Sequence, residues 1–305
     1  MANENKTVFG TFTEAIGIYL QHLPTFVKYM TFPVLGQFLG VILAFGLSLG
    51  FAFNAPNFIS DPSLIMPITL ILTIPGLVIL VKAFWEYLLA YVAISSMAEN
   101  TVKSGKIYDI DAHKQVALKR VPDFVGLWLL FGLFSFIAFL PPMWFFGAVI
   151  FVFLVLIFQV FTFEKLATPS ECFKRSWALV KTDFWGTLGL LALVGILTYW
   201  LLPRIAEMIL TAIQVMTFFT MLIDPMLTDS INSWNTALTT LNIHFMITSL
   251  MITKMIVGSI ISTIIICYTL PIRSIAWTLW YKKLNTAMIK ANSKKKKKAD
   301  KKDNV

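Results

Sequence analysis

The chain has 305 residues, of which 57% are hydrophobic and 13% are charged, and it carries a formal net charge of +9. Soluble domains have about a quarter of their residues charged, so this chain has too few polar groups to cover a surface that faces water. The composition excludes an ordinary soluble domain and indicates an integral membrane protein. The start of the chain, MANENKTVFG, predicts no cleavable signal peptide, because it has no basic stretch followed by an apolar core.

Apolar runs long enough to cross a bilayer need about 20 residues at a rise of about 1.5 Å each. The chain has six such runs, and we expect an all-α membrane protein with six transmembrane helices. Pro141 and Pro142 predict a tight turn between the third and fourth helices. The expected spans are residues 26–53, 64–97, 124–140, 143–163, 184–202 and 245–281.

A short amphipathic helix is expected before each odd-numbered span. The first would begin with a capping box at Thr11 and Glu14, and the second would begin at Asp109 or Asp111. The lead-in segments end in LPTF, VPDF and KTDF, which align on Phe26, Phe124 and Phe184. The protein is therefore predicted to consist of three repeats of an interfacial helix and a helical hairpin. The alternative is that helices entering a membrane share an aromatic, capped and basic approach without being repeats.

The second span contains Lys82 and Glu86 four residues apart, with Trp85 between them. This spacing places both charges on one helical face, where they would form an ion pair. A proton or headgroup site is one interpretation, because ionisable groups in a span are often functional. The other is that Lys82 reaches the interface and Trp85 lies in the aromatic belt, and we favour it from the depth of these residues.

The third lead-in segment, TPSECFKRSWALVKTDFW, carries the clearest local signals. Thr168 and Glu171 have the spacing of a capping box, and Pro169 suits the first helical position. The spacing also places Phe173, Trp177 and Val180 on one apolar face. The bases Lys174, Arg175 and Lys181 are expected on the opposite side, facing water, and the nearby Glu164 is expected to form a local ion pair.

Three features of the C-terminal half leave alternatives open. Residues 205–223 are long enough to span but carry a polar stripe, so we interpret them as an amphipathic or re-entrant helix after a break at Pro203. Lys254 lies about 13 Å into the expected sixth helix. Either the preceding loop extends to about Leu250, or Lys254 faces the interior and pairs with an acid. Arg273, two residues after Pro271, is explained by a proline kink and an interfacial anchor.

Lys and Arg residues are concentrated in alternate connections, namely those after the second, fourth and sixth spans. The positive-inside rule places these connections and both termini in the cytoplasm. We expect a membrane domain over residues 1–285 and a disordered Lys-rich tail over residues 286–305. The tail is expected to meet anionic headgroups of membrane lipids at the cytoplasmic face. The alternative is a solvated tail that only fixes the topology. Its bases are not interleaved with aromatic residues, so nucleic-acid binding is not expected.

Two segments, FEKLATPSECFKRSWALVKTDFWGTLGLLALVGIL and YTLPIRSIAWTLWYKKL, resemble the glycerophosphoryl-diester-phosphodiesterase membrane-domain family and its YciC-like relatives. The similarity is clearest over residues 163–197 and 268–284. It implies a six-helix module of the bacterial cytoplasmic membrane with a role in membrane or envelope homeostasis. The sequence contains no segment like the soluble phosphodiesterase domain found in some members, so hydrolase activity is not implied.

No catalytic, cofactor-binding or metal-binding motif is evident, and the histidines lie in separate segments. We therefore expect a non-enzymatic membrane protein that acts as a scaffold or in lipid homeostasis. The alternative is a transporter or lipid-moving protein. The residues singled out as candidates are Lys82, Glu86, Lys254, Glu164, Lys174, Arg175, Trp177 and Arg273.

Overall fold

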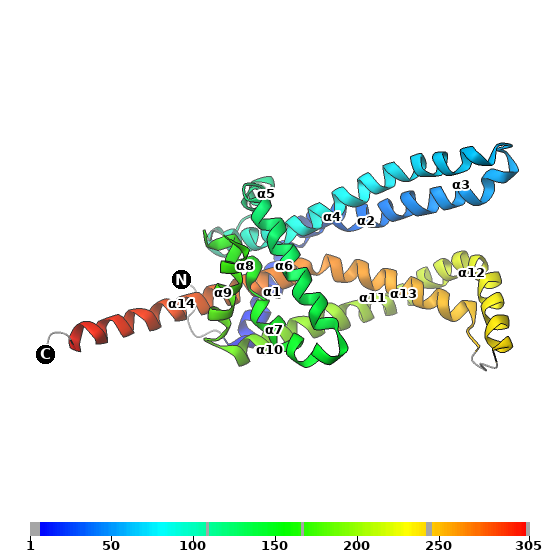
Figure 1. Cartoon of the computed structure of the whole chain (residues 1–305). Coiled ribbons are helices and arrows are strands. Elements are labelled where there is room, and N and C mark those ends of the chain that lie inside the picture. Colours follow the sequence, from blue (N-terminus) through cyan, green and yellow to red (C-terminus); the bar gives the residue numbers. More distant parts are fainter. Residues whose placement is uncertain (1–6, 108–109, 166–167, 242–245, 303–305) are drawn as a thin grey trace. The chain divides into compact units, whose positions relative to one another are not determined.

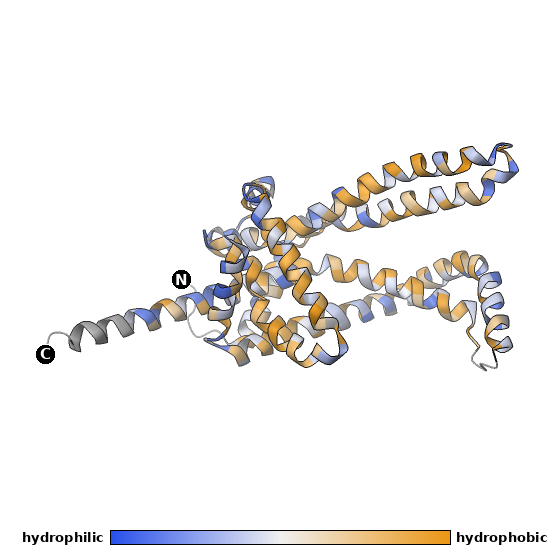
Figure 2. Ribbon diagram, in the orientation of Figure 1, coloured by the Kyte–Doolittle hydropathy of each residue, from blue (hydrophilic) through white to orange (hydrophobic). Residues whose placement is uncertain are grey.

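The computed structural model describes residues 7–107, 110–165, 168–241 and 246–302 (Figure 1). Within these ranges the chain is helical and has no β-strand. Six helices in the described ranges are long and apolar enough to cross a membrane, and this confirms an all-α, multi-pass membrane protein (Figure 2). Their bounds are Leu23–Asn57, Pro62–Ser104, Val121–Ala138, Pro141–Phe163, Phe184–Ala212 and Ser249–Ser293. The predicted start of the sixth span, Phe245, lies outside the described residues.

The chain forms two compact units. Unit 1 comprises residues 1–194 and 270–305, and unit 2 comprises residues 195–269. The main helices of unit 1 are α1 (Val8–Gln21), α2 (Leu23–Val41), α3 (Ser48–Asn54), α4 (Ile65–Ser104), α5 (Ile110–Leu118), α6 (Val121–Phe139), α7 (Trp144–Leu154), α8 (Ile157–Phe163), α9 (Pro169–Val180), α10 (Phe184–Gly195) and α14 (Leu270–Lys302). Unit 2 contains the π-helical turn η5 (Ile196–Leu201) and helices α11 (Leu202–Ala212), α12 (Val215–Thr240) and α13 (Ser249–Tyr268).

The predicted order of a short helix followed by two spans occurs three times, with α1, α5 and α9 as the short helices. In the third copy α12 lies between the two spans. Phe26 and Phe124 are fully buried, whereas the aligned Phe184 is half-buried. Lys119 and Arg120 follow the end of α5 and so lie outside this helix.

Local capping signals are confirmed at α9 and wrong at α1. In α9 the Glu171 backbone N–H donates to Thr168 Oγ1 at 3.4 Å, and the Thr168 N–H donates to Glu171 Oε2 at 3.0 Å. Helix α1 instead begins at Val8, where the Thr7 hydroxyl accepts a hydrogen bond from Gly10. Thr11 lies one turn inside the helix, because Thr7 is itself a good N-cap and takes that role earlier in the chain. Asp109, one of two predicted caps of the second lead-in helix, lies outside the described residues.

The core of unit 1 lies around the first part of α14. Residues 270–281 are buried without interruption, and a helix that is buried on every side passes through the centre of its bundle. Helices α1, α4, α8 and α9 contact it. The backbone of α14 remains helical to Lys302, including residues for which the sequence predicts disorder. Lysine and alanine have high helix propensity, so they extend a helix that has already begun in the core.

The hairpin of the first two spans depends on glycine. Gly36 and Gly40 lie one turn apart on α2 and face α4. A methyl group at Gly40 would lie 2.6 Å from the backbone nitrogen of Leu80, and one at Gly36 would lie 2.8 Å from Ala83 Cβ. Small residues at this spacing let two helix backbones approach closely, which is how helices associate within lipid.

The predicted break at Pro203 is wrong. Helical residues continue from Phe184 through η5 to Ala212, and Pro203 lies in the first turn of α11. The wider π turn disrupts the regular pattern of hydrogen bonds between residues four apart, so a proline is tolerated there. The chain turns instead at Gln214, whose φ is +62°. Residues 205–223 are therefore divided between the fifth span and α12 and do not form a span of their own.

Candidate functional site

The first polar cluster joins three helices of unit 1 and is centred on Glu164, the C-cap residue of α8. Arg175 Nε, from α9, lies 2.8 Å from both carboxylate oxygens of Glu164. The Tyr281 hydroxyl, from α14, donates to Glu164 Oε1 at 2.8 Å. Arg175 Nη2 also donates to Asn285 Oδ1 at 2.8 Å, so the guanidinium is held by both α8 and α14. We call Glu164, Arg175, Tyr281 and Asn285 the closed cluster.

The closed cluster corrects one prediction for α9. The sequence predicts that Arg175 faces water, but its side chain turns inward and is 27% exposed. It lies next to the buried residues Cys172, Ser176 and Leu179 on α9. A helical wheel drawn for α9 alone does not show Glu164 or α14, and these partners compensate for the cost of turning a charge inward. The cluster also brings together the two segments on which the family resemblance rests.

Two other candidates on α9 remain at its surface. Lys174 is exposed. Trp177 is 37% exposed and stacks on Phe153, with ring centroids 4.0 Å apart. Lys181 Nζ lies 5.8 Å from the centroid of the Trp177 ring. These contacts place aromatic and cationic groups together, as is typical of a membrane–water interface.

The predicted ion pair between Lys82 and Glu86 is wrong. Glu86 pairs with Lys114 of α5, with Nζ 2.8 Å from Oε2. Lys82 Nζ lies 5.6 Å from the centroid of the Phe32 ring, a cation–π contact with α2. Lys114 was available because α5 packs against α4, a tertiary contact that the spacing within α4 does not reveal.

Arg273 lies in the buried part of α14 and is only 6% exposed. The sequence explains it as an interfacial anchor beside Pro271, but the side chain belongs to the core of unit 1.

Cys172 of α9 is likewise buried, and burial raises the pKa of its thiol to about 11. The Cys172 thiol therefore stays protonated at neutral pH, which makes it a poor nucleophile.

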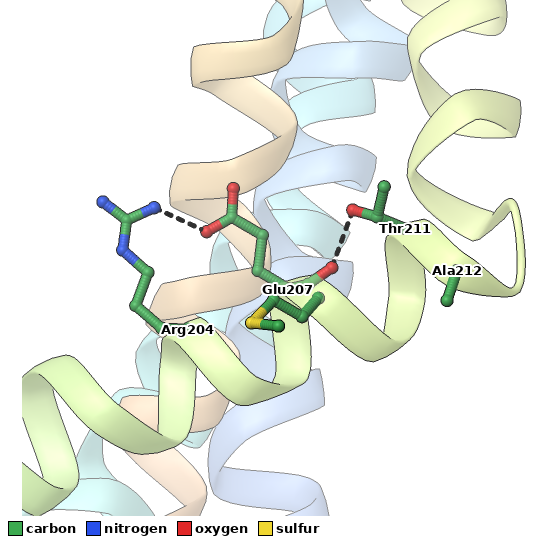
Figure 3. A pocket seen from close by; sticks show the side chains of 5 residues that line it. Arg204, Glu207, Thr211 and Ala212 are labelled. Carbon is green, nitrogen blue, oxygen red and sulfur yellow. Dashed lines mark hydrogen bonds and ion pairs between the residues drawn. The ribbon is translucent and has the colours of Figure 1, made fainter.

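The second polar cluster lies within unit 2. The ion pair of Arg204 and Glu207 on α11, with Nη1 2.9 Å from Oε2, lines two cavities. Figure 3 shows the residues that line one of them: Arg204 faces the Glu207 carboxylate, and the Thr211 hydroxyl donates to the Glu207 backbone carbonyl. The other cavity, of about 490 Å³, is also lined by Lys254 of α13. We call Arg204, Glu207 and Lys254 the open cluster.

The position of Lys254 agrees with the first of the two alternatives from the sequence. Helix α13 begins at Ser249, so the preceding loop extends to Thr248, and Lys254 lies about 7.5 Å along the helix. The polar stripe of residues 205–223 was recognised in the sequence as a surface feature. Its role in lining a cavity with Lys254 was missed, because the segments lie some fifty residues apart and nothing in the sequence pairs them.

Comparison with known proteins adds no assignment: no protein family, no curated protein and no solved structure matches the chain. Among the described residues, no group of three or more His, Cys, Asp and Glu side chains is placed to hold a metal ion.

Proposed function

We propose that the protein is a non-enzymatic module of the bacterial cytoplasmic membrane that acts as a scaffold in lipid or envelope homeostasis. One observation carries the proposal: both oxygens of Glu164 are occupied by Arg175 and Tyr281, so the closed cluster holds helices together. The resemblance of two segments to the phosphodiesterase membrane-domain family supports the same role, and we propose membership of that family.

Lipid analysis of a deletion strain tests this proposal. We expect the ratio of anionic to zwitterionic phospholipid to change in the mutant and to return when the full chain is supplied on a plasmid. A variant with Glu164→Ala should fail to restore it if the closed cluster maintains the scaffold. An unchanged lipid composition in the deletion strain, at several temperatures and osmolarities, would rule out a homeostatic role.

We further propose that both termini and the basic connections face the cytoplasm, in contact with anionic headgroups. The support is the distribution of Lys and Arg between alternate connections. Reporter fusions at Lys106 and at the C-terminus should report a cytoplasmic location, and a fusion within α12 at Asn232 an external one. A fusion at Lys106 that reports the external compartment would contradict this topology.

A second candidate function, movement of a lipid or solute, is favoured by the open cluster and by the π-helical turn η5 beside it. Charged groups and irregular helices within spans are common at transport sites. A flux and lipid-scrambling assay on the purified protein in vesicles separates the two functions. Transport that Lys254→Gln abolishes would favour this second function, and activity no higher than in protein-free vesicles would exclude it.

A further inference from the structure

The cavity of the open cluster is formed by two facing stripes of side chains in unit 2. Tyr199 and Trp200 of η5, with Arg204 and Glu207 of α11, line one wall. The other wall comes from α13, where residues spaced four apart share a face: Lys254, Gly258 and Ser262. Ser259 contributes a further hydroxyl.

The two walls come close together at Gly258. A methyl group at Gly258 would lie 3.6 Å from Glu207 Oε1, in ordinary contact, so the carboxylate lies directly over the α13 backbone at this point. Glu207 is 31% exposed and Arg204 is 65% exposed, so the pair is accessible from the cavity. In Figure 3 the Arg204 guanidinium extends away from α11, and one of its nitrogens faces the Glu207 carboxylate.

The charges in this cavity do not cancel. Arg204 neutralises Glu207, which leaves the ammonium of Lys254 as a net positive charge. No ion pair or hydrogen bond joins Lys254 to any residue in the described part of the chain. A lysine in an apolar span is costly unless it meets an anion or water. The cavity therefore presents a cation without a protein counter-ion.

The size and the lining residues of the cavity suit a lipid headgroup. Its volume of about 490 Å³ falls within the range typical of small-molecule sites, and its mouth is open. Trp200 is 61% exposed, and tryptophan side chains favour the level of the headgroups. Ser259 and Ser262 add hydroxyl donors beside the lysine. An acidic protein segment would need a wider basic surface than one lysine and one paired arginine.

We propose that this cavity binds the phosphate of an anionic glycerophospholipid headgroup. Lys254 supplies the counter-ion, Arg204 directs its remaining guanidinium N–H groups to the same phosphate, and the two serines donate hydrogen bonds to its oxygens. The acyl chains remain outside the cavity. This inference requires only that the fifth and sixth spans lie in a membrane, so it is independent of the scaffold function. It concerns the same cavity as the proposed movement of a lipid or solute, and lipid retention without transport would support this inference alone.

Native mass spectrometry of the full-length protein, released from micelles that contain equal amounts of phosphatidylglycerol and phosphatidylcholine, tests the proposal. We expect the wild type to retain phosphatidylglycerol preferentially. Lys254→Gln should weaken this retention about fivefold, as expected for the loss of one lysine–phosphate attraction. Lys254→Arg should retain the lipid, because the charge is preserved.

Lys82→Gln is the matched control, because Lys82 is also an exposed lysine in a candidate span but lies in unit 1 beside apolar side chains. It should bind lipid as the wild type does. Equal losses in Lys82→Gln and Lys254→Gln would show only general attraction of lysines to headgroups and would overturn the proposal. Displacement of the lipid by millimolar inorganic phosphate would identify a soluble anion as the ligand and would also overturn it. Unchanged unfolding midpoints of both variants confirm that the loss is one of binding.

Discussion

The two polar clusters each contain a carboxylate paired with an arginine, yet they are built in opposite ways. In the closed cluster the partners come from three helices, and Glu164 accepts from Arg175 and Tyr281 at 2.8 Å each. In the open cluster Arg204 and Glu207 lie three residues apart on one helix, and the arginine is 65% exposed. Lys254 lines the same cavity as this pair.

This difference indicates different roles. A charged pair that joins distant segments and is bonded to side chains of several helices stabilises the fold, since removal of one partner leaves the other without compensation. A pair within one helix contributes little to stability, and its exposed donors remain available to a ligand. We therefore assign a structural role to the closed cluster and a binding role to the open one.

The largest expected effect is that of Glu164→Ala. This change removes the acceptor for both Arg175 and Tyr281 and should lower the free energy of unfolding by about 2 kcal/mol. The measurement is equilibrium unfolding of the purified protein in mixed micelles, followed by circular dichroism.

Glu207→Ala is the control for this change, and it should cost about 0.5 kcal/mol or less, because its partner is exposed and on the same helix. Tyr281→Phe should cost about 1 kcal/mol, since it removes one hydrogen bond but keeps the ring stacked on Phe163. If Glu207→Ala proves as destabilising as Glu164→Ala, the distinction between the clusters is lost.

A smaller effect is expected from Trp280→Phe in the core of unit 1. The Trp280 indole N–H donates to Thr187 Oγ1 at 2.9 Å, and both side chains are fully buried. The variant should lose about 1 kcal/mol of unfolding free energy from the hydrogen bond and the smaller ring. Trp200→Phe is the control, because it alters an exposed ring at the cavity of unit 2, and it should leave the unfolding midpoint unchanged. An equal loss of unfolding free energy in Trp280→Phe and Trp200→Phe would argue against a rigid core in unit 1.

A further prediction concerns pH and Cys172, and its effect is confined to alkaline pH. Burial raises the pKa of this thiol from 9.0 to about 11, so between these values the unfolded chain loses the proton while the folded protein keeps it. Stability should therefore fall as pH rises from about 9 to about 11. Cys172→Ala should flatten this part of the pH profile; an unchanged slope would show that Cys172 is not buried as described.

Much of the fold follows from the sequence because lipid imposes a simple rule: a span needs a long apolar run. All six runs become candidate spans, and the turn at Pro141 and Pro142 lies where the sequence places it. The capping box at Thr168 was also predictable, because it depends on residues three apart. These are the features that local sequence determines.

The candidate sites were harder to predict, because they depend on contacts between distant segments. Glu86 pairs with Lys114 and not with Lys82, and Arg175 turns inward to Glu164 and α14. The periodicity of a single helix predicts neither of these pairings. The break predicted at Pro203 is wrong for a local reason. Proline is a plain signal for a helix break, whereas the π-helical turn that accommodates it has no comparable signal in the sequence.

Double-mutant cycles on the two pairs test the central claim most directly, because they isolate the coupling between partners from other effects of each substitution. For Glu164→Ala with Arg175→Ala, we predict a coupling free energy of about 1.5 kcal/mol or more. For Glu207→Ala with Arg204→Ala, the predicted value is about 0.5 kcal/mol or less. Equal coupling in the two pairs would contradict the account of one closed and one open cluster.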